Sequence, residues 1–153
     1  MNKQKLVREQ LEISLRRFHP LLAVSIPPKG WIRAIRDALS MSARQLANRL
    51  GLSQQAISRI EQDELVGSVT VKTLQRVAQS LDCVFVYGFV PRSSLESTIR
   101  QQAQRVAVKR LGKVAQTMAL EDQALGQREN QKILIGLVEN MTNNPPSNLW
   151  EES

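Results

Sequence analysis

The chain has 153 residues, enough for one domain with appendages, and its 21 lysine and arginine side chains outnumber 14 acidic ones, for a formal net charge of +7. This balance favours a polyanionic partner. One cysteine and one histidine exclude an internal disulfide, a cysteine-rich zinc site and a histidine metal cluster. No nucleophile, base and orienting group can be assembled from the remaining residues. We therefore expect no enzyme activity, no metal and no cofactor.

No apolar run approaches the ~18 residues of a membrane span, and no signal peptide opens the chain. The expected location is therefore the cytoplasm, without a membrane partner. Charge is distributed unevenly: residues 92–113 hold six basic and one acidic side chain, whereas residues 114–153 hold two basic and six acidic ones. The acidic C-terminal end is not an expected contact to a polyanion.

Residues 1–28 are expected to form an N-terminal amphipathic helix, over residues 3–18, and a proline-rich linker. The apolar stripe of this helix consists of Leu6, Leu11, Leu15 and Phe18. A helix of this length is not stable by itself in water. It must therefore dock, either on its own domain or a sister subunit, or on another protein.

Residues 29–91 are expected to form a DNA-binding domain that begins with a helix from Trp31 to Leu39. The inward residues of that helix are Ile32, Ile35 and Leu39. Arg33 and Arg36 either reach phosphate or remain solvated charges.

The stretch Met41–Glu61 predicts two short helices joined by a tight turn. Leu46, Ala47 and Leu50 share one face of the first helix. Gly51 suits the left-handed backbone of a helix end, and Ser53 suits the N-cap of the next helix. The second helix is expected from Gln54 to Glu61, with Ala56, Ile57 and Ile60 inward. Together these features predict a helix-turn-helix.

The outward residues of the second helix are candidates for reading bases: Gln54, Gln55, Ser58 and Arg59. An amide side chain can pair with the N6/N7 edge of adenine, and a guanidinium with O6/N7 of guanine. The N-terminal turn of such a helix enters the major groove. The alternative is an ordinary solvated polar face. Arg44 and Ser53 are expected to hold the DNA backbone, which fixes register without reading sequence.

A loop from Gln62 to Val69 is expected next, followed by a helix from Val71 to Leu81 that Thr70 caps. Cys83–Val90 is rich in β-branched and aromatic residues and predicts a strand. A lone strand leaves a bare edge, so we expect it to pair with a second subunit and to form a homodimer. The dimerisation candidates are Val84, Phe85, Val86 and Tyr87. Local pairing is the alternative, and Cys83 is expected to be a buried thiol.

Residues 92–153 are expected to form a C-terminal helical region and an acidic tail. A long helix is predicted over residues 94–118, with apolar residues recurring every four positions and several basic residues. A second helix is predicted over residues 127–141. The tail is expected to be loose unless Trp150 docks.

The central stretch resembles the phage-repressor-like helix-turn-helix superfamily. The resemblance is carried by Gln45-Leu46-Ala47, Gly51-Leu52-Ser53 and Ile57-Ser58-Arg59-Ile60-Glu61. It implies a sequence-specific, repressor-type DNA-binding regulator whose partner is a double-stranded DNA operator. It also implies further DNA-backbone contacts from Thr70 and Lys72. The expected fold is mainly α, with a repressor-like helix-turn-helix core, an N-terminal accessory helix, one β-strand after the core and two C-terminal helices.

The whole chain also resembles the mobile mystery protein A family. The resemblance is carried by the basic N-terminal helix, the linker into Gly30-Trp31, the helix-turn-helix, Leu81-Asp82-Cys83 through Val90-Pro91, and the two C-terminal helices. It implies a neighbouring Fic-domain partner, and therefore an antitoxin-like, autoregulatory protein. The alternative is an interaction module that mainly sequesters a toxin, with DNA binding secondary.

The chain does not resemble the Fic enzyme itself, because His19-Pro20 is followed by Leu21-Leu22-Ala23 and no Gly-Asn-rich anion loop is present. Inhibition of Fic enzymes is often mediated by a helix with the pattern Ser/Thr-x-x-x-Glu-Gly/Asn. Thr117 and Glu121 match that pattern, whereas Asp122 departs from it. These two residues are therefore either a partner-inhibitory motif or an ordinary helix end.

Overall fold

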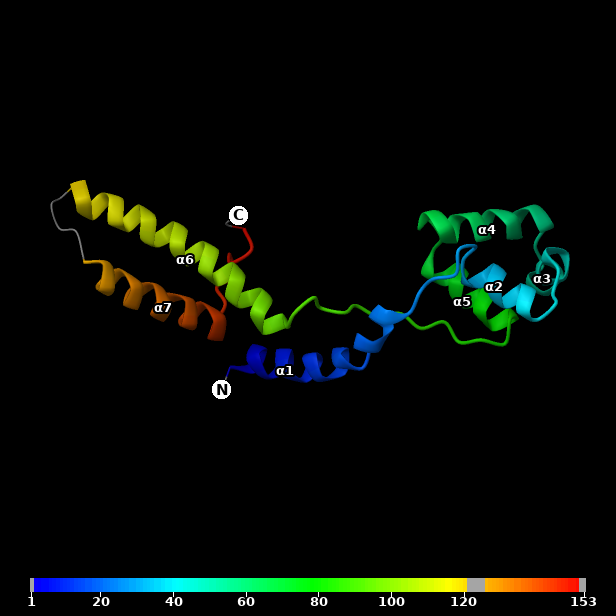
Figure 1. The fold of residues 1–153 in the computed structure, drawn as a ribbon, viewed down its shortest axis with the longest axis horizontal. Coiled ribbons are helices and arrows are strands. Elements are labelled where there is room, and N and C mark those ends of the chain that lie inside the picture. Colours follow the sequence, from blue (N-terminus) through cyan, green and yellow to red (C-terminus); the bar gives the residue numbers. More distant parts are fainter. Residues whose placement is uncertain (1, 121–125, 152–153) are drawn as a thin grey trace. The chain divides into compact units, whose positions relative to one another are not determined.

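The structure is a computed structural model that describes residues 2–120 and 126–151, without the side chains of residues 115, 119 and 120. Over these residues the chain is helical and contains no β-strand (Figure 1). The elements are α1 (Lys3–Arg16), the 3₁₀ helix η1 (His19–Ala23), α2 (Trp31–Ala38), α3 (Ala43–Leu50), α4 (Gln54–Val66), α5 (Val71–Ser80), α6 (Leu95–Leu120) and α7 (Gln127–Asn143). They form two compact units: Pro20–Gly88, and Met1–His19 with Phe89–Ser153.

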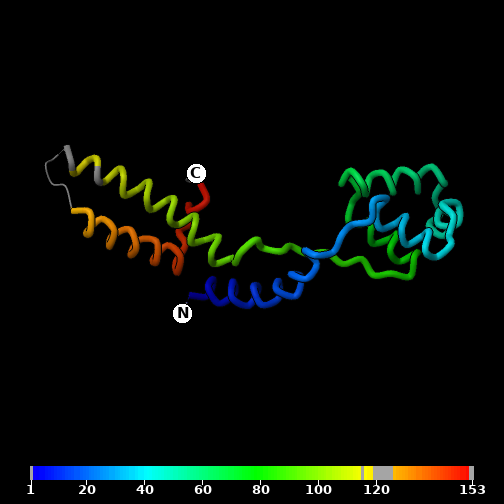
Figure 2. The backbone as a smooth tube through the Cα atoms, in the orientation of Figure 1, coloured from blue at the N-terminus to red at the C-terminus, as the bar shows by residue number. Residues whose placement is uncertain are grey.

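In the unit Pro20–Gly88, helices α2 to α5 lie together (Figure 2). All four helices contribute side chains to one hydrophobic core. The buried residues are Ile32, Leu46, Ala47, Ile57, Val77 and Leu81. Of the side chains expected on the inner faces of α3 and α4, Leu46, Ala47 and Ile57 are buried, and Leu50 and Ile60 are partly buried against them. Burial of this set provides the main stabilisation that short helices lack by themselves.

The helix ends in this unit follow the local signals in the sequence. Ser42 and Gln45 form a reciprocal capping box at the start of α3. Gly51 ends α3 with φ of 67° and ψ of 32°, in the left-handed region. The Ser53 Oγ accepts a hydrogen bond from the Ala56 N–H (3.1 Å) at the start of α4. The expected turn geometry is confirmed, and it sets the direction of α4.

Helix α4 is longer than expected, because it continues to Val66 rather than ending at Glu61. Residues after Glu61 pose no obstacle to a helix, and Gly67, with φ of 79°, provides the left-handed end. The loop between α4 and α5 is correspondingly shorter than the predicted Gln62–Val69. The prediction that Leu39 faces inward is also wrong, because α2 ends at Ala38 and Leu39 is exposed.

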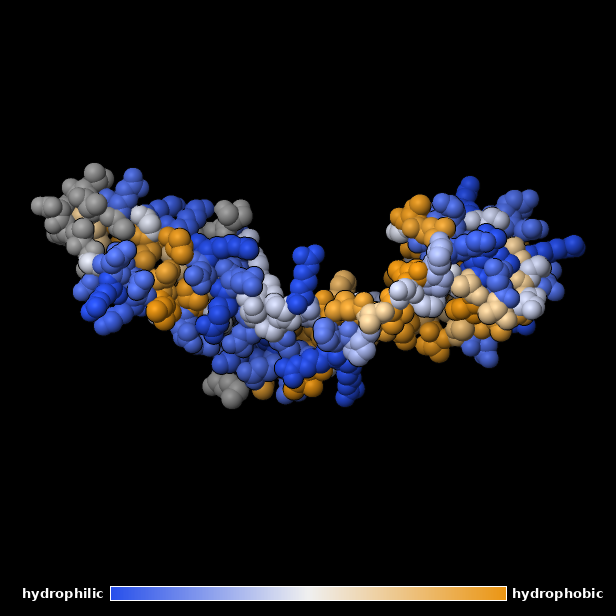
Figure 3. All heavy atoms as spheres, viewed as in Figure 1, coloured by the Kyte–Doolittle hydropathy of each residue, from blue (hydrophilic) through white to orange (hydrophobic). Residues whose placement is uncertain are grey.

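The predicted strand over Cys83–Val90 is wrong for this chain. No residue of this segment is in a strand, and Val84 is 86% exposed. Figure 3 shows hydrophobic residues along the connection that follows α5. A strand needs a neighbouring ladder of N–H and C=O groups, and the described part of the chain offers none. Cys83 is exposed, so the expectation of a buried thiol is also wrong.

In the other unit α6 packs along α7. The buried contact consists of Ala103, Val106, Ala107, Val138, Met141 and Leu149. The small residues on α6 let the two helices approach closely. The tail is held by Leu149, which is fully buried and whose carbonyl accepts a hydrogen bond from Gln102 Nε2 (2.9 Å). Trp150 itself is half-exposed, so the tail docks through its neighbour.

Helix α1 docks on its own chain, which is the first of the two alternatives. The buried Arg8 donates from Nη2 to the Thr142 carbonyl (3.3 Å), near the end of α7. Asn2 donates from Nδ2 to the Asn143 carbonyl (2.8 Å). The Glu12 carboxylate accepts the Leu95 N–H at the start of α6 (3.1 Å). These contacts tie α1 to both C-terminal helices.

Candidate nucleic-acid interface

Four candidate base-reading residues lie together on the exposed face of α4. Gln54, Gln55, Ser58 and Arg59 are all exposed, whereas Ile57 on the opposite face is only 1% exposed. The Ser58 Oγ donates to the Gln54 carbonyl (3.3 Å), so its hydroxyl is partly engaged within the helix. The amides and the guanidinium of this face carry the donors and acceptors that major-groove base edges require.

The turn between α3 and α4 is closed by backbone hydrogen bonds. The Leu52 N–H donates to the Ala47 carbonyl (2.9 Å), across the left-handed Gly51. Ala47 is itself buried under Ile57 in the core, and it is small enough to let the two helices approach. The exposed face of α4 is therefore held by a short, fixed connection rather than by a mobile loop.

A buried ion pair anchors the middle of α4 to α2. Arg36 Nε donates to Glu61 Oε1 (2.8 Å), Nη2 donates to Oε2 (3.3 Å), and Nη1 donates to the Met41 carbonyl (2.9 Å). This hydrogen bonding to the Glu61 carboxylate raises the pKa of Arg36 above its ordinary value. Arg36 is 8% exposed, so both expectations for it, phosphate contact and solvated charge, are wrong. Arg33 is exposed and lies near Asp37 (3.8 Å).

A second anchor joins the last turns of α4 to the start of α2. The Glu64 carboxylate accepts the Trp31 N–H (2.8 Å) and the Ile32 N–H (3.1 Å). Carboxylates stabilise helix N-termini because the first N–H groups lack partners within the helix. Gly30 precedes these residues with φ of 84° and ψ of 165°. Sequence reasoning missed this contact, because nothing local relates residues separated by more than thirty positions.

The candidate DNA-backbone residues lie at helix starts. Arg44, in the first turn of α3, and Lys72, in the first turn of α5, are exposed. Neither makes an ion pair within the part of the chain that the structure describes. The Thr70 Oγ1 accepts the Thr73 N–H (3.1 Å) and donates to Thr73 Oγ1 (2.9 Å). Ser53 also caps its helix, so the two hydroxyls have structural roles beside any contact with phosphate.

The partner-inhibitory candidates are only half described. Thr117 is exposed near the end of α6, and its Oγ1 donates to the Lys113 carbonyl (3.1 Å). Glu121 lies outside the described residues. The partner-inhibitory motif therefore stays a prediction.

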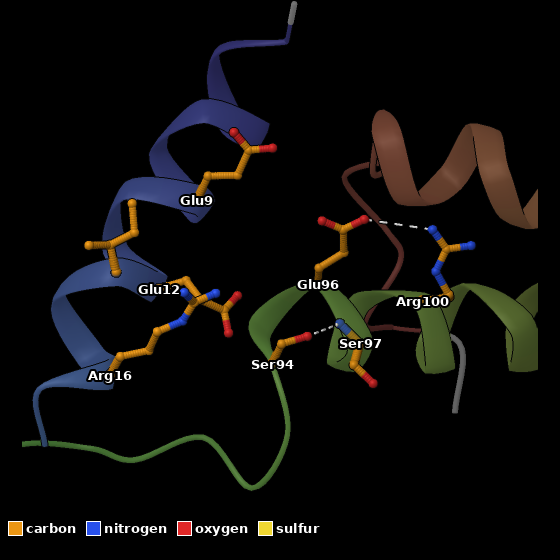
Figure 4. Close-up of a pocket in the computed structure, with 8 residues that line it drawn as sticks. Glu9, Glu12, Arg16, Ser94, Glu96, Ser97 and Arg100 are labelled. Carbon is orange, nitrogen blue, oxygen red and sulfur yellow. Dashed lines mark hydrogen bonds and ion pairs between the residues drawn. The ribbon is translucent and has the colours of Figure 1, made fainter. Parts of the chain in front are cut away.

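A polar concavity of about 490 Å³ lies between α1 and the start of α6 (Figure 4). Three of its charged groups, those of Glu12, Glu96 and Arg100, have partners within the protein. Glu12 accepts the Leu95 N–H, and Glu96 lies 3.6 Å from Arg100. The Ser94 Oγ accepts the Ser97 N–H (2.9 Å) and caps α6. These groups build the start of α6 and carry no argument for a ligand.

Comparison with known families supports what the geometry of α2 to α5 indicates. The family model described as helix-turn-helix matches residues 32–85. These residues are a DNA-binding helix-turn-helix domain of the Cro/C1 repressor type. No curated protein and no solved structure matches the chain. Among the described residues, no helix is long and apolar enough to cross a membrane.

Proposed function

We propose that the protein is a sequence-specific transcriptional repressor that binds an inverted-repeat operator as a homodimer. The observation that carries this proposal is the exposed face of Gln54, Gln55 and Arg59 on a helix anchored to α2 through Glu61 and Glu64. A recognition helix must hold its side chains in a fixed register on the base edges. Two-fold symmetry then places half-sites about 10 bp, or a multiple of it, apart.

Base reading is assigned to Gln55, and backbone positioning to Arg44. Replacing Gln55 with alanine is expected to relax preference at one or two base positions by roughly 1–3 kcal/mol, because a bidentate contact is lost. Arg44→Ala should weaken binding to all sequences similarly and flatten the salt dependence by about one phosphate contact. The measurement is affinity for a panel of single-base operator variants at several salt concentrations.

The two variants are matched controls for each other, since each removes one exposed side chain from neighbouring helices. Wild-type protein that binds all duplexes alike would contradict the proposed function. If Gln55→Ala weakened every variant equally while Arg44→Ala reordered them, the assignment of roles would be reversed.

Dimerisation is assigned to the segment after α5. Val84, Val86 and Tyr87 are exposed, and Phe85 stacks on Tyr87 with ring centroids 5.9 Å apart. Val84, Val86 and Tyr87 are thus apolar side chains that the described parts of this chain leave largely uncovered. Packing against the same segment of a second subunit would bury these apolar side chains.

Val86→Pro is expected to shift the protein from dimer to monomer, because it removes the valine side chain from the apolar surface and fixes φ at about −65° within the segment that forms that surface. The substitution should leave the monomer folded, since Val86 is exposed and lies outside every helix. Sedimentation at micromolar concentration measures the mass, and circular dichroism reports the fold. Ile26→Pro serves as the control, because Ile26 is exposed, lies outside the helices, and has an N–H without a hydrogen bond among the described residues. A folded Val86→Pro dimer would refute this interface.

The resemblance to mobile mystery protein A supports an antitoxin-like role, in which the protein represses its own operon and binds a Fic-domain partner. Helices α1, α6 and α7 form a unit separate from the helix-turn-helix, so they are the assigned partner-binding region. The alternative is a module that mainly sequesters a toxin. A Fic-domain product of the adjacent reading frame that co-purifies with the chain supports the partner. Operator binding by the chain alone then distinguishes repression from sequestration.

A further inference from the structure

Helix α6 carries a row of exposed cations that the helix-turn-helix does not explain. Arg105, Lys109 and Lys113 recur every four residues and are all exposed. Positions four apart lie on one side of an α-helix, so the three charges form a row about 12 Å long at 1.5 Å per residue. We call these three residues the α6 basic row.

The buried side of α6 lies next to the row, and all three residues of the row are exposed. Ala103, Val106 and Ala107 alternate with the row and are buried against α7. The long side chains of the row therefore extend into solvent. The packing of α6 on α7 determines this orientation, so it does not depend on where the other unit lies.

Acidic side chains do not neutralise the α6 basic row. Residues 92–113 contain a single acid, Glu96, which pairs with Arg100. Glu139 of α7 also pairs with Arg100 (3.4 Å). Within the described residues no ion pair involves the row, and Arg105 donates only to the uncharged Gln102 Oε1 (3.4 Å). Three like charges one turn apart repel one another and destabilise an isolated helix slightly. A bound anion would reduce this repulsion.

We propose that the α6 basic row binds the phosphate backbone of duplex DNA, independently of base sequence, as a second contact beside the helix-turn-helix. A duplex carries one negative charge per about 1.7 Å of its axis, with both strands counted. About 12 Å of duplex, equal to the length of the row, therefore carries about seven phosphates. An anionic membrane surface fits less well, because an interfacial helix needs a free apolar face. The apolar face of α6 is buried against α7.

DNA binding by the α6 basic row rests on the proposed repressor function in one respect, that the helix-turn-helix brings the chain to DNA. Its test is the salt dependence of binding to duplex DNA without an operator. In the full-length protein, Arg105→Gln, Lys109→Gln and Lys113→Gln together remove the row and keep good helix formers on exposed positions. The plot of log affinity against log salt should become shallower by about 2–3, at roughly 0.9 per phosphate contact.

A matched control removes the same charge elsewhere. Lys3, Arg17 and Lys132 are exposed and lie outside the row, and changing all three to glutamine should leave the slope nearly unchanged. Equal loss of slope in both variants, or no loss in the row variant, would overturn the proposal. The proposal would also be overturned if the row variant kept its DNA binding but lost binding to phosphatidylserine vesicles. Operator ranking is measured separately, so failure of base reading would not be mistaken for failure of the row.

Discussion

Replacing Glu61 with alanine is expected to lower the free energy of unfolding of the helix-turn-helix unit by about 3–5 kcal/mol. The substitution leaves the Arg36 guanidinium buried without the Glu61 carboxylate. Its remaining partners are the Met41 carbonyl and the half-exposed Asp37 carboxylate, 3.4 Å from Nη1. Desolvation of an unpaired charge is costly, and this cost exceeds that of most single substitutions. Because Glu61 lies on α4, operator binding should fall together with stability.

The unfolding of this unit can be followed separately, because each unit contains one tryptophan. In a Trp150→Phe background, Trp31 fluorescence during urea unfolding reports on the unit that contains α2. Asp37→Asn is the control: its carboxylate also lies near Arg36 (3.4 Å) but is half-exposed, so the loss should be about 1 kcal/mol or less. Equal costs for the two substitutions would contradict the assigned role of Glu61.

Two further measurements separate a buried charge from lost packing. Arg36→Met combined with Glu61→Leu should recover most of the stability, because an apolar pair leaves no unpaired charge. The hydrogen bond to Glu61 raises the pKa of Arg36 above its ordinary value, so the stabilisation is fully present at neutral pH and is lost only in strong alkali, as pH rises through that raised pKa. Because Arg36 stays protonated throughout this range, its charge state should not change the cost of Glu61→Ala around neutral pH.

Gly30→Ala is the second substitution with a large expected effect, a destabilisation of about 2–4 kcal/mol. The backbone of Gly30, at φ of 84° and ψ of 165°, lies in a region that is essentially restricted to glycine and costs other residues about 1–3 kcal/mol. A Cβ would also lie 2.7 Å from Glu64 Oε1. The carboxylate would have to move away from the Trp31 N–H, and loss of such a cap costs about 1 kcal/mol more.

Gly67→Ala is the matched control, because Gly67 also has positive φ (79°) but an added Cβ would meet no atom within 4 Å. Unfolding followed by Trp31 fluorescence should show a smaller loss, about 1–2 kcal/mol, from backbone strain alone. Glu64→Ala should cost less in the Gly30→Ala background than in the wild type, since the displaced carboxylate no longer caps α2. Strict additivity would show that the two residues act independently.

Local chemistry in the sequence was sufficient to place most of the helix-turn-helix. Gly51 ends α3 and Ser53 starts α4 through interactions within a few residues, so their effect could be predicted from the local sequence. The inward side of α4 followed from its apolar spacing, and Ile57 is buried as expected. The exposed position of Gln54 and Gln55 followed from the same periodicity.

Only the tertiary structure decided the roles of residues whose partners are distant in sequence. A basic residue on a helix surface has the same local pattern whether it faces solvent or a buried carboxylate, so the position of Arg36 depended on Glu61. Cys83–Val90 has strand-forming residues, but a strand exists only with a neighbouring ladder, which the described chain does not provide. The sequence therefore determined the helix ends and their apolar faces. Tertiary packing decided which charges are buried and whether extended residues pair, because both depend on groups that meet only after folding.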